Sequence, residues 1–93
     1  MGSVAVRVDE ETLVREAIGG VEPPEGVRLR QVNVDYVDST GDLAVQVIFA
    51  VKKSIPLTKK RVVQLSRFKR AVAERISSLD LQKWPFVNFA ETR

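Results

Sequence analysis

The chain has 93 residues, of which 44% are hydrophobic and 29% charged, and its formal net charge is +3 at pH 7. This length and composition predict one folded domain over residues 1–93 and exclude a disordered tail, and no apolar run is long enough to span a membrane. The sequence contains no Cys and no His, so disulfides are excluded and the commonest metal ligands and catalytic bases are missing. We therefore expect a non-enzymatic protein without cofactor or metal, and a cytoplasmic location, because the first residues do not resemble a signal peptide.

The first part of the chain predicts a short strand followed by a short helix. Residues 3–8 alternate Val with other residues, and a period of two is typical of a strand. Asp9 is a good N-cap, and the two glutamates after it lie in the first helical turn, where the helix dipole favours acids. We therefore expect a helix over residues 9–18 that is ended by Gly19 and Gly20.

Two strands joined by a turn are expected next. The apolar positions of residues 27–38 change face at Arg30 and Gln31, which predicts a β-bulge and is typical of a sheet edge. Residues 38–42 contain the turn formers Asp, Ser, Thr and Gly. Residues 43–51 are apolar on one face and mostly apolar on the other, so they predict an interior strand.

The strongest periodic signal lies in residues 58–79, which predict a long amphipathic helix around which the rest of the fold is organised. Thr58 suits the N-cap position, and no Gly or Pro interrupts the run. Spacings of three and four residues place seven apolar side chains on one face of this helix. These side chains are Val62, Leu65, Phe68, Val72, Ala73, Ile76 and Leu79.

Positive charge is concentrated around this helix. Residues 1–51 hold four Lys/Arg and nine Asp/Glu, a net charge of −5, whereas residues 52–83 hold ten and two, a net charge of +8. This asymmetry indicates an anionic partner or head-to-tail association, although a solvated outer helix face explains it as well. If the partner is RNA, the candidate phosphate-binding residues are Lys52, Lys53, Lys59, Lys60, Arg67 and Arg70.

Residues 84–90 predict a closing strand, with Pro85 at its start or on a sheet edge. The order β-α-β-β-α-β then favours an α+β two-layer sandwich of the ferredoxin-like type. In that arrangement the bulged strand and the proline strand are edges, and residues 43–51 are central. If the first strand is absent, the alternative is an αββαβ, KH-like core.

An open sandwich leaves one sheet face without helices, and an exposed apolar face is typical of a partner surface. We therefore expect a small interaction or assembly module, most simply a homodimer that associates through its sheet. The alternative is an RNA-binding module that uses the basic helix face without sequence preference. Trp84, Phe86 and Phe89 could stack on bases, but packing in a core or interface is more typical. The predicted interface residues are Ala44, Gln46, Ile48 and Ala50.

No Walker A loop, G-x-G-x-x-G or GxxG motif is present, but two partial resemblances each cover less than half of the chain. Residues 68–89, FKRAVAERISSLDLQKWPFVNF, resemble the closing helix and strand of ribosome-binding factor A, a KH-fold family without the GxxG loop. That family has an Ala-x-Gly kink where residues 65–67 read Leu-Ser-Arg here. Residues 55–72 resemble the alkaline-shock protein family at three residue pairs. These pairs are Ile55-Pro56, Val63-Gln64 and Ala71-Val72. The first resemblance implies family matches at Phe68, Arg70 and Arg75.

Overall fold

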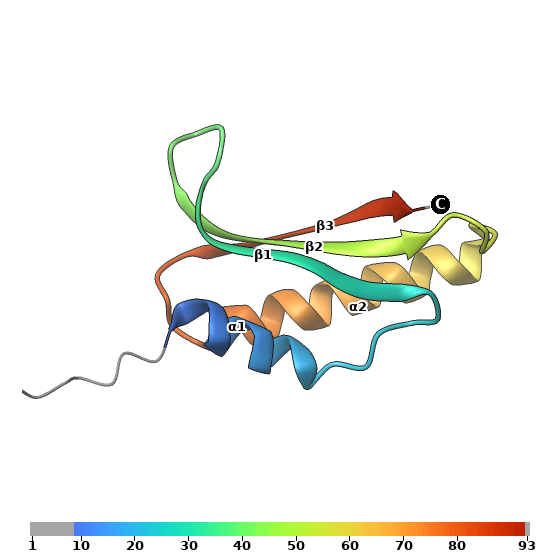
Figure 1. The fold of residues 1–93 in the computed structure, drawn as a ribbon, viewed down its shortest axis with the longest axis horizontal. Helices are drawn as coiled ribbons and strands as arrows, with labels where there is room; N and C mark the ends of the chain where they lie inside the picture. Colours follow the sequence, from blue (N-terminus) through green and yellow to red (C-terminus); the bar gives the residue numbers. More distant parts are fainter. Residues whose placement is uncertain (1–8, 93) are drawn as a thin grey trace, which may run out of the picture.

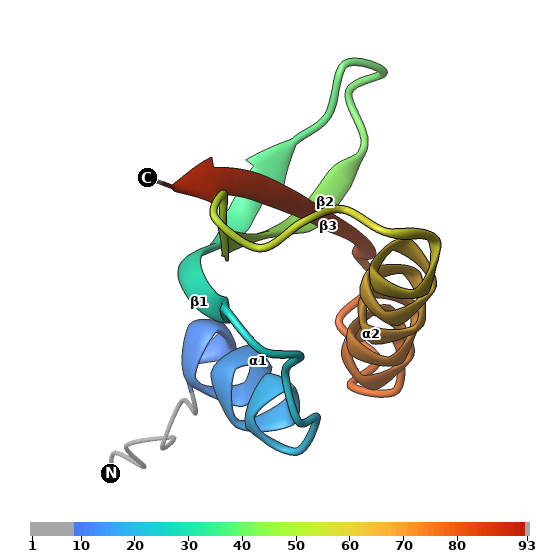
Figure 2. The same cartoon turned by 90° about the vertical axis from the view of Figure 1, so that its right-hand side faces the viewer.

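The structure is a computed structural model that describes residues 9–92. It is an α+β arrangement in two layers, because both helices lie on the same side of a three-stranded mixed sheet (Figure 1, Figure 2). In chain order the elements are α1 (Glu10–Gly19), β1 (Val27–Val37), β2 (Leu43–Lys52), α2 (Lys59–Ser77) and β3 (Trp84–Thr92).

The sheet has the order β1-β2-β3, so the doubly apolar strand β2 is central, as predicted. β1 runs antiparallel to β2, and β3 runs parallel to it. The predicted bulge is confirmed, because the register shifts between Leu29 and Gln31. A second shift between Asn33 and Tyr36 was not predicted. These irregularities lie on an edge strand, where they hinder pairing with another chain.

The ferredoxin-like order expected from the sequence is not confirmed. That order requires a strand between residues 43–51 and the last strand, whereas β2 pairs directly with β3 from Ala44 opposite Trp84 onward. α2 returns the chain to the start of β2, so β3 runs parallel to β2. Among the described residues no strand lies between the two. The strand predicted over residues 3–8 lies outside the described residues. The described elements follow the order α-β-β-α-β, which is the alternative order.

The core lies between the sheet and the helices. α1 lies against β1 and α2 against β3, and the two helices contact each other. The ring of Phe49 on β2 meets the ring of Phe68 edge to face, with centroids 4.8 Å apart. A tilted contact with Phe89 at 6.2 Å extends this aromatic group to β3. The buried core residues are Val14, Ile18, Val27, Val32, Val45, Val47, Phe49, Leu65, Phe68, Val72, Ile76 and Val87.

The buried face of α2 differs from the prediction at its first turn. Val62 was expected in the apolar face, but it is 45% exposed. Arg61, which lies four residues before Leu65, takes the corresponding place and is only 6% exposed. Residues three and four positions before Leu65 can both lie on its face of the helix, so spacing alone did not decide whether Val62 or Arg61 would be buried. The apolar residues that are buried as predicted are Leu65, Phe68, Val72 and Ile76.

Polar contacts fix the N-terminal ends of both helices. The predicted N-caps are confirmed: Asp9 Oδ1 accepts a hydrogen bond from Glu11 N, and Thr58 Oγ1 accepts one from Arg61 N. The ammonium group of Lys83 forms an ion pair with Glu10 and donates to the backbone carbonyl of β1 at position 34. The start of α1, the middle of β1 and the connection before β3 are therefore held together.

Replacement of Phe49 by Ala tests the central role of the aromatic contact. Phe49 is almost completely buried, so Phe49→Ala should lower the free energy of unfolding by about 3–5 kcal/mol. The control is Val63→Ala on the exposed side of α2, which should change it by less than ~0.5 kcal/mol. Urea unfolding followed by circular dichroism measures both, and equal effects of the two substitutions would contradict this description of the core.

Candidate functional site

The face of the sheet that points away from the helices is covered by no other described element, and we call it the open sheet face (Figure 2). Side chains alternate between the two faces of a strand, and directly paired residues point to the same face. Its apolar members are absent from the core cluster, which supports this assignment. The register assigns to it Arg28, Gln31, Asn33, Tyr36, Ala44, Gln46, Ile48, Ala50, Lys52, Trp84, Phe86, Asn88, Ala90 and Thr92.

Three aromatic rings gather at the hairpin end of the open sheet face. Tyr36, Ala44 and Trp84 form one row across the three strands. The ring of Phe86 stacks on Trp84 at 5.1 Å and meets the ring of Tyr36 edge to face at 5.5 Å. Trp84 is 41% exposed, although large aromatic side chains are usually more deeply buried. We call Tyr36, Trp84 and Phe86 the aromatic cluster.

The β1–β2 turn fixes one side of the aromatic cluster. Trp84 Nε1 donates to Asp38 Oδ2 at 2.7 Å. The other carboxylate oxygen of Asp38 accepts from the hydroxyl of Thr40 and from the backbone amides of Thr40 and Asp42. The Thr40 hydroxyl bond contributes most to lowering the pKa of Asp38, and partial desolvation opposes it. Gly41 has a φ of 87°, so the predicted turn does use a left-handed glycine.

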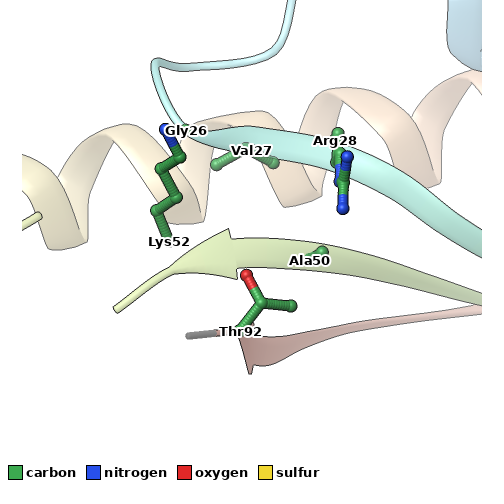
Figure 3. A pocket seen from close by; sticks show the side chains of 6 residues that line it. All are labelled: Gly26, Val27, Arg28, Ala50, Lys52 and Thr92. Atoms are coloured by element: carbon green, nitrogen blue, oxygen red, sulfur yellow. The ribbon is translucent and has the colours of Figure 1, made fainter. Parts of the chain in front are cut away.

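The opposite end of the open sheet face is hollow and basic. A cavity of about 260 Å³ at this end is lined by side chains from β1, β2 and β3, among them Arg28, Ala50 and Thr92 (Figure 3). The exposed side chains of Arg28 and Lys52 border it, and Lys52 extends toward Gly26. About 20 Å separates this cavity from the row of the aromatic cluster, since Ala44 and Ala50 are six residues apart on β2.

The four interface residues predicted from β2 do lie on the open sheet face, but they differ in accessibility. Ala44 is 0% exposed and lies between Tyr36 and Trp84 on the neighbouring strands. Ala50 is 3% exposed and lies between Arg28 and Ala90. Gln46 and Ile48 are half-buried, so they present accessible surface at the centre of the face. Ala44 and Ala50 therefore offer almost no accessible surface to a partner.

The sequence indicated the aromatic residues only in part. Trp84 and Phe86 are two residues apart, which predicts a common face of a strand. Phe89 has the opposite parity and packs in the core instead. Tyr36 was missed because two register shifts in β1 make the face of its far end unpredictable from alternation.

The six cationic candidates are all exposed, but they do not form one surface with the aromatic cluster. Lys52 and Lys53 follow β2, and Lys59 and Lys60 lie at the start of α2, so these four residues are near one end of the domain. Arg67 and Arg70 lie two to three turns farther along α2, in the helical layer. Among the six, only Lys52 belongs to the open sheet face.

The remaining observations concern metals, membranes and known proteins. Within residues 9–92 no three or more Asp and Glu side chains are grouped as a metal site would require. Neither helix of this part of the chain has the length and apolar composition to cross a membrane.

No family model, curated protein or solved structure matches the chain. The two resemblances noted above therefore have no support beyond the residues quoted for them.

The contact between Asp38 and the single tryptophan predicts a pH-dependent fluorescence signal. The pKa of Asp38 is lowered in the folded protein, so its stabilising effect is complete above the unfolded pKa of ~3.9 and is lost as the pH falls through the lower folded value. Trp84 emission should therefore change with a midpoint below the usual range for Asp, while circular dichroism still reports a folded chain. In Asp38→Asn this step should be absent, and an unchanged step in that variant would assign it to another carboxyl group.

Proposed function

We propose that this protein is a non-enzymatic interaction module that self-associates through its open sheet face. The observation that carries this proposal is the aromatic cluster on a sheet face that neither helix covers. Exposed aromatic groups are enriched where proteins bind one another, because they bury a large area with few rotatable bonds. Ile48 and Gln46 continue this accessible surface along the central strand.

The two ends of the open sheet face complement each other, which favours a second copy of the chain as the partner. One end carries the aromatic cluster and the carboxylate of Asp38, and the other carries the cavity above Ala50 with Arg28 and Lys52. A two-fold axis across the strands at the middle of β2 would place each end over the opposite end of the other copy. Aromatic rings would then face a cavity and a guanidinium group, an arrangement stabilised by packing and cation–π attraction.

The size of the open sheet face limits the strength of this association. Ten residues per strand and three strands give a footprint of about 30 by 15 Å, or ~450 Å². A standard stable interface buries ~800 Å² per partner. We therefore expect a weak dimer that forms in the micromolar range and dissociates on dilution, rather than an obligate dimer.

A charge at the centre of the open sheet face should abolish self-association. In Ile48→Lys two ammonium groups would meet near the two-fold axis, so the variant should remain monomeric. The wild-type chain should shift from monomer to dimer between about 5 and 500 μM, as measured by sedimentation equilibrium. The matched control is Val63→Lys, which adds the same charge at an exposed apolar residue of α2 and should dimerise normally. A wild-type chain that stays monomeric over this range, or a folded Ile48→Lys that dimerises like wild type, would contradict the proposal.

The alternative proposal is an RNA-binding module, supported by the cationic residues near the start of α2 and by the α-β-β-α-β order of a KH-like core. α2 is unbroken through residues 65–67, so it has no GxxG loop of the kind with which KH domains clamp a nucleic acid backbone. Binding would then rest on phosphate contacts alone. Such binding is independent of sequence and weakens steeply with salt.

A salt titration tests this alternative. Lys59→Glu combined with Lys60→Glu should weaken binding to a fluorescent single-stranded RNA, and each lost phosphate contact should reduce the slope of log K against log salt by ~0.7. Fluorescence anisotropy measures the affinity. The control is Arg15→Glu combined with Arg30→Glu, which changes the net charge equally at exposed residues outside the candidate set. No binding by the wild-type chain at about 50 mM salt, or equal losses in the two double variants, would exclude this function.

A further inference from the structure

The guanidinium group of Arg61 is buried without a counter-charge. Its Nη2 atom is inaccessible and has no hydrogen-bond partner among the described residues. The two ion pairs found in that part of the chain, Arg15 with Glu11 and Lys83 with Glu10, do not involve it. A guanidinium stays protonated in proteins, and a buried charge without a partner is strongly unfavourable. The described residues therefore leave Nη2 of Arg61 without a hydrogen-bond acceptor.

Arg61 borders a cavity at the start of α2. The cavity has a volume of about 340 Å³, far more than the ~30 Å³ that one water molecule occupies in the liquid. Arg61 is one of the residues that line this cavity. Its Nη2 atom also lies 3.6 Å from the position that a Cβ would take at Gly26, a residue that lines the neighbouring cavity beside Ala50. The lining residues are Pro24, Glu25, Ile55, Pro56, Thr58, Lys60, Arg61 and Gln64.

The start of α2 adds hydrogen-bond donors and positive charge to this cavity. The first backbone bond of the helix runs from Val62 N to Thr58 O, so the amides of Lys59 and Lys60 have no acceptor within the helix. The first turn contains no acidic residue. Three consecutive cations there oppose the helix dipole, which would favour acids. A bound anion would compensate for all of these features at once.

Only one acidic side chain lines the cavity. Glu25 is exposed, and its carboxylate is not within ion-pair distance of Arg61 in the structure. The turn around Gly26, which has a φ of 74°, passes close to Lys52 and Ile55. The positive φ at position 26 is a conformation that glycine adopts readily and that L side chains rarely adopt, so this turn favours glycine. The turn therefore lies beside the inaccessible Nη2 atom, and Arg61 also lines the cavity at the start of α2.

We propose that this cavity binds a tetrahedral oxyanion of the phosphate class, with Arg61, Lys60 and the N-terminus of α2 as its ligands. The planar guanidinium suits phosphate oxygens, and helix N-terminal amides favour anions. A free phosphate ion and the phosphoryl group of a small phosphomonoester share this chemistry. The site is separate from the open sheet face, and it does not depend on self-association.

The test is an NMR titration of the full chain with sodium phosphate at constant ionic strength. The backbone amide signals of Lys59, Lys60 and Arg61 should shift and saturate at millimolar phosphate, and the melting temperature should rise by roughly 5–10 °C at ten times the dissociation constant. A parallel titration with phenyl phosphate distinguishes the sources. Tighter binding of the ester indicates a phosphorylated metabolite, and equal or weaker binding indicates the free ion.

Variants separate a specific site from general attraction to a basic region. Arg61→Met keeps a side chain of similar length without charge and should bind phosphate at least tenfold more weakly. Lys60→Gln should lose about threefold, and it remains informative if Arg61→Met does not fold. The control is Arg70→Gln on the same helix, which should bind as wild type does. Because Glu25 repels an anion, Glu25→Gln should bind two- to threefold more tightly.

Three outcomes would overturn the proposal. The first is the absence of saturable shifts in the wild-type chain up to about 50 mM phosphate. The second is an equal affinity in wild type and in a folded Arg61→Met. The third is a lower melting temperature of Glu25→Gln together with no effect of phosphate on either chain, which would identify Glu25 as the counter-charge of Arg61 in solution.

Discussion

The contact between Phe68 on α2 and Phe49 on the core face of β2 is the one on which the rest of the structure depends. Phe49 and Phe68 meet edge to face at 4.8 Å, and Val72 and Ile76 extend the same buried helix face. This contact places α2 alongside β3 and lets the chain return in parallel to β2. With α1 against β1, both helices cover the same side of the sheet, so neither helix covers the other face of β2.

The two ends of the domain therefore differ in the side chains that they expose and in the charge that they carry. Aromatic side chains and Asp38 lie at the hairpin end of the sheet, while Arg28 and Lys52 lie at the other end. The start of α2 adds further cations at that second end, including the buried Arg61. A distribution of this kind suits a self-complementary interface on the open sheet face. The anion site that we propose at the start of α2 is separate from this interface. Its basis is the burial of the Arg61 charge rather than an exposed positive charge.

The candidate sites could be predicted from the sequence only where local spacing decides which way a side chain points. Alternation along β2 correctly grouped Gln46 and Ile48 on one face, and the spacing of Trp84 and Phe86 implies a shared face. Burial depends on neighbours from other strands, so the sequence did not indicate that Ala44 would have no exposed surface. The position of Tyr36 on the open sheet face was not predicted, because two register shifts in β1 interrupt the alternation of its side chains. The local sequence does not show how many residues such an irregularity contains.

The sequence by itself determined the elements that rest on contacts between near neighbours: the capped starts of both helices at Asp9 and Thr58, the bulge near Arg30 and the glycine turn before β2. Only the tertiary structure decided that β2 and β3 pair directly, that three aromatic rings from two strands meet, and that Arg61 rather than Val62 is buried. These outcomes depend on contacts between residues far apart in the chain. Periodicity describes the face of one element, whereas the partner of that face is chosen by the packing of the whole chain.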